Sequence, residues 1–328
     1  MVLGHESSGQ VVEVGDAVTR VKVGDRFAIE PGVPSRYSDE TKEGRYNLCP
    51  GMAFAATPPI DGTLVKYYLS PEDFLVKLPE SVSYEEGACV EPLSVGVHAN
   101  KLADVRFGNR VVVFGAGRVG LLTGAVARAF WARDVIFVDI FENKLERAKD
   151  FGATHTLNSA KFPANKTKEF PDDIQKLLGG SLADVVFECS GADSCIDAGI
   201  KIVKVGGTMV QIGMGKNYVN FPIAEVSGKE MHLIGCFRYC FGDYRDAVEL
   251  VASGKVNVKS LITHRFKFED AAKAYDFNIS HGAEVVKTII QGPEWCDAVD
   301  SKLKSGQSIH ISGWYKILKK ENDMKWKI

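Results

Sequence analysis

Residues 110–139 constrain the fold of this chain more than any other stretch. Residues 110–114 (RVVVF) are apolar and rich in β-branched side chains, which predicts a short strand buried on both faces. The turn that follows, residues 115–120 (GAGRVG), has the pattern G-x-G-x-x-G, and an apolar helical stretch comes after it. A second apolar run at 135–138 (VIFV) ends on Asp139. This order of strand, glycine-rich turn, helix, strand and acid is typical of a dinucleotide-binding unit.

Each part of this unit has a chemical purpose. The glycines allow a tight turn and a close approach of the backbone to a pyrophosphate, toward which the following helix directs its unpaired N–H groups. An acid at the end of the second strand can accept hydrogen bonds from ribose hydroxyls, and its charge disfavours a 2′-phosphate. We therefore expect Gly115, Gly117, Gly120 and Asp139 to bind NAD. The alternative is a glycine-rich loop that binds no nucleotide.

The composition excludes several classes of protein. A chain of 328 residues suggests about two domains, and 45% hydrophobic with 25% charged residues is ordinary for a globular protein. The net charge of −2 gives no reason to expect nucleic acid or an anionic membrane as partner. No segment is predicted to span a membrane. Seven cysteines without a CxxC pair favour a reducing cytoplasm over a disulfide framework.

The pattern of the chain changes twice along its length. Residues 1–91 are β-rich, with strands expected at 9–14, 26–29, 64–68 and 74–77 and a long surface loop at 31–60. Residues 92–235 alternate helix and strand, which predicts an α/β fold with a doubly wound parallel sheet. Residues 236–294 are mixed again. The tail at 295–328 is rich in Lys and Ser, and we expect a disordered appendage there, with an added function as the alternative. The simplest arrangement is a nucleotide-binding domain inserted between two pieces of a second domain.

Three residues outside the nucleotide unit have side chains that zinc can bind. His5 and Glu6 supply an imidazole and a carboxylate side by side, although a solvated turn is the alternative for such a pair. Glu91 precedes Pro92 at the start of the helical connection into the nucleotide domain. Its alternative role is that of a helix-capping carboxylate.

Taken together, the motifs resemble those of a known family. They occur in the order GHESSGQVVEVG, DGTLVKYY, VEPLSVGVHA, VFGAGRVGLL, VVFECSGA and GGTMVQIGMG. The chain resembles the zinc-containing medium-chain dehydrogenases over residues 1–294, and among them the fungal sorbitol/xylitol (polyol) dehydrogenases. The resemblance implies a Rossmann domain inserted in a GroES-like catalytic domain. Cys49 alone stands where alcohol dehydrogenases proper carry four cysteines, so a structural zinc is not expected.

The resemblance also implies roles for individual residues. His5 and Glu6 match the catalytic zinc ligands, while Glu91, Arg238 and Tyr239 match residues that contact the substrate or its surroundings. The positions that match the family's NAD contacts are Val119, Asp139, Lys144, Ile212, Gly213, Met214, Phe237 and Arg238. The implied reaction is the NAD- and zinc-dependent oxidation of a polyol to a ketose, in a homo-oligomer that is commonly a tetramer.

Two departures from the family matter. The family's cysteine zinc ligand lies in a segment upstream of the position where this chain begins, so we expect an incomplete catalytic zinc site and a partial GroES-like domain. Trp131 stands where relatives place the glycine that ends a helix, a position that is costly for a bulky side chain. The alternatives are therefore an inactive relic that only binds NAD, or a zinc-free reductase, against which His5, Glu6 and Glu91 argue.

Overall fold

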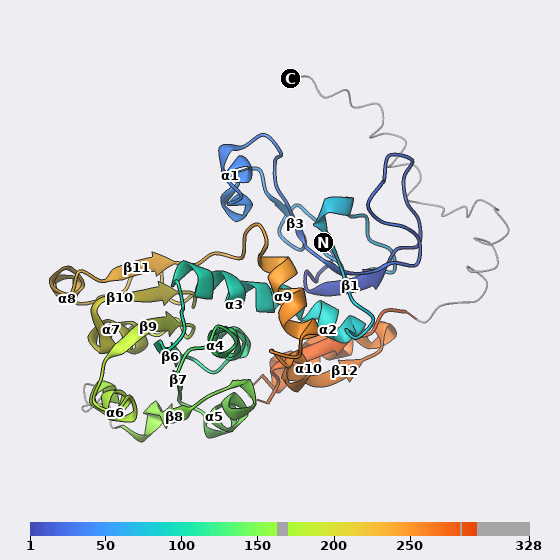
Figure 1. The fold of residues 1–328 in the computed structure, drawn as a ribbon. Coiled ribbons are helices and arrows are strands. Elements are labelled where there is room, and N and C mark those ends of the chain that lie inside the picture. The colour runs from blue at the N-terminus through green and yellow to red at the C-terminus, as the bar shows by residue number, and fades with distance from the viewer. Residues whose placement is uncertain (163–169, 283, 294–328) are drawn as a thin grey trace.

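The sheet with the most strands among the described residues is a six-stranded parallel one in the computed structural model, which describes residues 1–162, 170–282 and 284–293 (Figure 1). The strand order is β11-β10-β9-β6-β7-β8, and every neighbouring pair is parallel. The strands are β6 Arg110–Phe114, β7 Asp134–Asp139, β8 His155–Asn158, β9 Ala183–Glu188, β10 Val203–Gln211 and β11 His232–Gly235. The predicted doubly wound sheet is confirmed, whereas the tail at 295–328 lies outside the described residues.

Helices cover both faces of this sheet. They are α3 Val90–Leu102, α4 Arg118–Ala129, α5 Glu142–Ala148, α6 Phe170–Leu177, α7 Asp193–Ile202 and α8 Ile223–Gly228. Alternate side chains of β6 enter two separate cores: Val111 and Val113 belong to the core under α3 and α4, and Val112 and Phe114 to the core under α6 and α7. The strand is thus buried on both faces, as its uninterrupted apolar sequence predicts.

Smaller sheets make up the rest of the described chain. The strands β1 Ser7–Gln10, β2 Arg26–Ile29 and β5 Leu75–Lys77 form an antiparallel sheet, and β3 Gly32–Val33 pairs with β4 Ala53–Phe54. The later strands β12 Ile262–Phe266 and β13 Lys287–Ile290 pair in parallel. The helices here are α1 Asp39–Lys42, α2 Tyr84–Ala88, α9 Asp243–Ala252 and α10 Ala271–Ser280.

Two expectations about the β-rich part are wrong. Residues 64–68 form no strand: Leu64 N–H still bonds to Leu3, but Val65 N–H turns back to Thr63, so the pairing stops there. The strand expected at 9–14 begins earlier and ends at Gln10. Short antiparallel strands depend on partners far away in the chain, so local composition predicts their ends poorly.

Backbone conformation at two helix ends follows the sequence expectation. Gly152 ends the turn after α5 with φ +84, the left-handed region that glycine adopts freely. Trp131 follows α4 with φ +68, so a bulky residue occupies the same kind of position. Its side chain is 67% exposed and gains little from packing in return.

The helix α3 lies between the two parts of the fold (Figure 1). It packs against α4 of the large sheet on one side and against α9 on the other. The first turn of α3 therefore reaches the place where the glycine-rich turn and the loop after β11 meet the N-terminal segment. Among the described residues, no helix is long and apolar enough to cross a membrane.

Candidate active site

The glycine-rich turn is shaped by close backbone contacts. Gly115 has φ +92, and a Cβ atom added at Gly120 would lie 1.8 Å from the carbonyl oxygen of Gly115. A Cβ atom at Gly117, the N-cap of α4, would meet nothing within 4 Å. The turn therefore requires glycine at 115 and 120 for its own packing, while Gly117 leaves open space beside the helix N-terminus. Such a space fits the pyrophosphate of a dinucleotide.

Asp139 ties this turn to the end of β7. Its Oδ2 accepts a hydrogen bond from Ala116 N–H at 2.7 Å, and its Oδ1 accepts from Ile140 N–H at 2.8 Å and Phe141 N–H at 3.0 Å. A carboxylate has about four acceptor positions, so Oδ2 retains room for one ribose hydroxyl. This geometry is compatible with the predicted role of Asp139 in binding the ribose. It also gives Asp139 a structural role in the glycine-rich turn.

The other predicted cofactor residues follow the carboxyl ends of several strands, which share one edge of a parallel sheet. Val119 lies in the first turn of α4, and Lys144 lies in α5 with its ammonium 4.8 Å from the centre of the Phe141 ring. Ile212 and Gly213 follow β10 and donate their N–H groups to the carbonyl of Glu188. Met214 is 94% exposed and Phe237 is 49% exposed, so both side chains are accessible to a ligand.

His5, Glu6 and Glu91 form one cluster. The ligand atoms of the three side chains all lie within 4.8 Å of one another, although Glu91 is far from the other two in sequence. Glu91 is buried in the first turn of α3, and burial, followed by the charge of Glu6, raises the pKa of Glu91 to about 8. Burial lowers the pKa of His5, which favours the neutral imidazole that binds metals.

Two cations hold the Glu6 carboxylate. Lys287 Nζ donates a hydrogen bond to Glu6 Oε2, and Arg118 Nη1 lies 3.4 Å from Oε1. Burial alone would raise the pKa of Glu6, but the charges of Lys287 and Arg118 keep it below its usual value. Sequence reasoning missed Lys287. A signal was present, since a lysine inside the apolar run VVKTII requires a partner when that strand is buried.

The cluster fits a zinc ion in its donor set. One neutral imidazole nitrogen and two carboxylate groups are ordinary zinc ligands. Among the described residues, no cysteine joins this cluster. The expectation of a missing thiolate ligand therefore stays a prediction.

Arg238 and Tyr239 lie in the loop between β11 and α9. The Arg238 guanidinium lies 3.6 Å from the centre of the Phe54 ring and 4.7 Å from that of Phe237, and its backbone has φ +56. Tyr239 is 2% exposed and its ring packs edge-on against Tyr244 at 5.2 Å. The Tyr239 hydroxyl is buried on the Glu91 side without a hydrogen bond of good geometry to any described residue.

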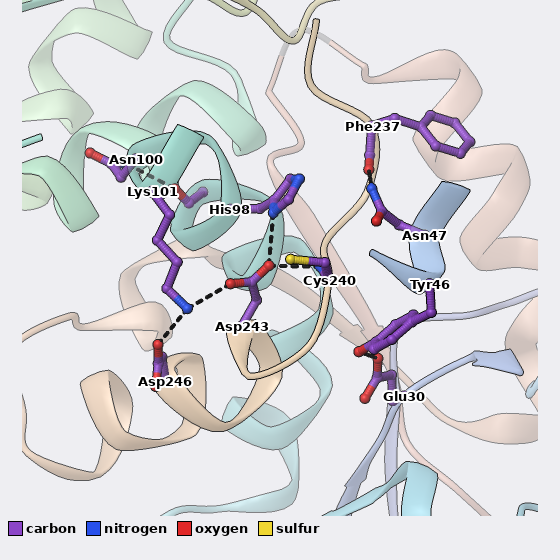
Figure 2. A network of polar contacts seen from close by, with 11 residues as sticks. Glu30, Tyr46, Asn47, His98, Asn100, Lys101, Phe237, Cys240, Asp243 and Asp246 are labelled. Atoms are coloured by element: carbon purple, nitrogen blue, oxygen red, sulfur yellow. Dashed lines mark hydrogen bonds and ion pairs between the residues drawn. The ribbon is translucent and has the colours of Figure 1, made fainter. Parts of the chain in front are cut away.

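A second cluster contains His98, Cys240 and Asp243 (Figure 2). Asp243 is fully buried and accepts three hydrogen bonds, from His98 Nδ1 at 2.8 Å, Lys101 Nζ at 2.7 Å and Cys240 N–H at 2.7 Å. Although burial alone would raise the pKa of Asp243, these partners keep it low. Its carboxylate is thus satisfied by protein donors, one of them a cation, so the cluster is a structural junction and a poor metal site.

The sequence family described as "Zinc-binding dehydrogenase" matches residues 119–253, and the one described as "Alcohol dehydrogenase GroES-like domain" matches residues 1–80. Sorbitol dehydrogenase 1 of Saccharomyces cerevisiae is 84% identical over 294 residues, which cover 90% of this chain and 82% of that protein. The chain belongs to the zinc-binding dehydrogenase family. Within this family it lies in the fungal polyol dehydrogenase branch.

More distant relatives support the same placement. A D-xylulose reductase of Saccharomyces cerevisiae is 57% identical over 294 residues, again covering 90% of this chain and 82% of that protein. Among solved structures, an Escherichia coli oxidoreductase/dehydrogenase of unknown specificity has a TM-score of 0.83 at 34% identity, covering 88% of this chain and 81% of that one. L-idonate 5-dehydrogenase of Escherichia coli has a TM-score of 0.79 at 28% identity, with the same coverage.

Proposed function

We propose that this chain oxidises a polyol of the sorbitol or xylitol type to the 2-ketose, with NAD as hydride acceptor and zinc at the catalytic site. The observation that carries the proposal is the contact between Arg118 and Glu6. Arg118 is the first residue of α4 in the glycine-rich turn, and its guanidinium lies 3.4 Å from the Glu6 carboxylate. The place for a dinucleotide and the cluster suited to a metal therefore adjoin each other.

Different residues would bind the metal ion and the cofactor in such a reaction. His5, Glu6 and Glu91 are the groups that would hold the zinc ion, and Gly115, Gly117, Gly120 and Asp139 would hold the dinucleotide. When bound, zinc supplies Lewis-acid polarisation of an alcohol oxygen and NAD supplies the acceptor for the hydride. The protein contributes the orientation of the carbinol carbon toward the nicotinamide ring.

Arg238 and Tyr239 are the groups proposed to orient the polyol. A polyol presents several hydroxyls in a row, each a donor and an acceptor. The flat Arg238 guanidinium, held over Phe54 at 3.6 Å, offers several fixed donors, and the unpaired Tyr239 hydroxyl offers one more group. A site with buried polar groups of this kind discriminates against an analogue that lacks the matching hydroxyl.

The test is a set of assays on purified protein. We expect zinc to copurify with the chain, and NADH to form from NAD and sorbitol or xylitol. Tyr239→Phe removes the buried hydroxyl beside Glu91, so it should raise KM for the polyol by roughly tenfold, about one hydrogen bond. Tyr218→Phe, at a side chain 91% exposed, is the matched control and should change nothing. A zinc- and NAD-loaded protein that oxidises neither polyol would contradict the proposal.

Three further features follow from the same family membership and are proposed with it. The boundaries of the inserted nucleotide-binding domain would lie near residues 91 and 235, close to the two places where the chain passes α3 and β11. The chain would assemble as a homo-oligomer, a tetramer by resemblance, and would reside in the cytoplasm. Light scattering on the purified protein tests the assembly.

A further inference from the structure

The loop of residues 236–242 holds its two proposed substrate-binding residues in a conformation that the loop alone does not favour. Arg238 has φ +56, a left-handed backbone that is uncommon for a residue with a large side chain. Such conformations persist only where the surroundings impose them. The contacts on either side of Arg238 therefore decide whether its guanidinium stays over Phe54.

Buried polar side chains hold the loop at two points, one before and one after Arg238 in the sequence (Figure 2). We call these two contacts the N-terminal and the C-terminal clamp. On the N-terminal side, Asn47 Nδ2 donates to the carbonyl of Phe237 at 2.7 Å. On the C-terminal side, the amide of Cys240 donates to Asp243 Oδ2 at 2.7 Å. Asn47 is 6% exposed and Asp243 is 0% exposed, so both side chains that make these bonds are shielded from water.

The C-terminal clamp also connects the loop to α3, the helix that contains Glu91. Asp243 Oδ2 also faces His98 Nδ1 at 2.8 Å, and Asp243 Oδ1 faces Lys101 Nζ at 2.7 Å. His98 follows Glu91 by two helical turns, so both side chains lie on the same face of α3. That face meets the loop at both ends: Glu91 lies beside Tyr239, and His98 holds Asp243.

We propose that Asp243, held by His98 and Lys101, is a positioning residue. It fixes where Arg238 and Tyr239 lie along α3 relative to Glu91. The inference rests on the proposed function of Arg238 and Tyr239 as polyol-binding groups. Asp243 itself touches neither substrate nor cofactor in this assignment. Its effect is transmitted through the Cys240 amide and the backbone of the loop.

The chain supplies a matched control. Lys101 also pairs with Asp246 at 2.6 Å, one turn further along α9, but the Asp246 side chain is 50% exposed and, among the described residues, makes no hydrogen bond to the loop. Asp243→Asn and Asp246→Asn therefore each remove one negative charge and one partner of Lys101. Only Asp243→Asn weakens the clamp on the Cys240 amide.

The first experiment is steady-state kinetics of the zinc-loaded variants with sorbitol, together with NADH affinity by fluorescence. Asp243→Asn should raise KM for the polyol by about ten- to a hundredfold with little change in NADH affinity, because the loop mainly serves the substrate. Asp246→Asn should stay within about twofold of the unmodified protein. Equal KM values for the two variants, or a loss of NADH affinity as large as the loss for polyol, would overturn the proposal.

The second experiment does not depend on turnover. Hydrogen exchange of the amides of residues 237–241 should accelerate in Asp243→Asn and stay unchanged in Asp246→Asn. Should Asp243→Asn fail to fold, Lys101→Gln tests the same clamp at a half-exposed position, with a smaller rise in both KM and exchange. A protein that oxidises no polyol would refute the proposed function alone. Unaltered exchange in both Asp243→Asn and Lys101→Gln would refute the positioning role.

Discussion

The six-stranded sheet and the small sheets beside it are held together in different ways. In the large sheet, Val111 to Phe114 of β6 are all 0% exposed, and packed helices cover both faces. In the antiparallel sheet, β1, β2 and β5 have 4, 4 and 3 residues, and most of these are only half-buried. Nearby, Leu69 is 84% exposed and Val23 is 58% exposed. The large sheet has apolar core on both faces, whereas the antiparallel sheet of β1, β2 and β5 contributes few residues to that core.

Single polar contacts between distant residues compensate in the small-sheet part. Tyr244 donates its hydroxyl to the carbonyl of Ile29 at 2.7 Å, and Arg26 Nη2 donates to the carbonyl of Val82 at 2.6 Å. Buried hydrogen bonds of this kind are directional, so they fix the position of a loop more precisely than apolar packing does. The comparison indicates that the large sheet provides stability, while the polar contacts provide the geometry of the proposed substrate site.

The largest effect that we predict concerns the glycine-rich turn of the large sheet. Gly120→Ala would place a Cβ atom 1.8 Å from the Gly115 carbonyl oxygen, a backbone atom that can yield only if the turn moves. We expect NAD binding to weaken roughly a hundredfold and the free energy of unfolding to fall by about 3 kcal/mol. Isothermal titration with NADH and urea unfolding measure the two effects.

The control for this substitution is Gly228→Ala, at the exposed end of α8, where an added Cβ meets nothing within 4 Å. Its unfolding free energy and NADH affinity should stay close to those of the unmodified chain. Unchanged NADH binding in Gly120→Ala would mean that the turn tolerates movement, and the glycine-rich turn would not depend on the close backbone contact at Gly120.

The same contrast explains what the sequence could predict. The strands β6, β7 and β9 are signalled by uninterrupted apolar runs, and Gly115 to Gly120 by a spacing that has a local physical cause. The clustering of His5, Glu6 and Glu91 followed only from the family resemblance, because it depends on contacts between distant segments. Lys287 on Glu6, and Asp243 on the loop of Arg238, escaped sequence reasoning for the same reason. The lysine inside the apolar run VVKTII signals that a partner is needed but does not say which one, and the contact of Asp243 leaves no periodic or local signal.

The next prediction compares two buried acids of the small-sheet part. Glu30 is 6% exposed and accepts a hydrogen bond from the Tyr46 hydroxyl, and burial raises the pKa of Glu30 to about 7. Its proton is therefore held more tightly in the folded chain than in the unfolded one. The unfolded chain binds fewer protons between the two pKa values, so stability should fall as the pH rises from about 4.5 to about 7.

Glu30→Gln keeps an acceptor for Tyr46 and removes this titration. The difference in unfolding free energy between the variant and the unmodified protein should shift in favour of the variant by about 1–3 kcal/mol from pH 4.5 to pH 7.5. Urea unfolding across that range measures this shift. Glu86 is the opposite case: burial would raise its pKa, but the Ser83 capping box keeps it below the usual value. Glu86→Gln should therefore lose stability above about pH 4.5, and the loss should vanish in acid. The same sign for both variants would contradict the assignment.

The smallest predicted effect lies at the end of α4. Trp131 has φ +68 and a side chain that is 67% exposed, so its backbone is strained without compensating burial. Trp131→Gly should raise the free energy of unfolding by about 0.5–1 kcal/mol, because glycine adopts this conformation without steric conflict, although its freer unfolded chain offsets part of the gain. Trp131→Ala separates the two possible causes, since alanine removes the exposed indole but keeps the Cβ atom and its strain. If alanine stabilises the chain as much as glycine does, the exposed indole is the source of the instability and the backbone of the large-sheet part is not strained there. If only glycine stabilises it, then even the better-packed part of the molecule contains a strained backbone position. The chain tolerates this strain because burial of the core beneath α4 stabilises the fold by more than the strain destabilises it.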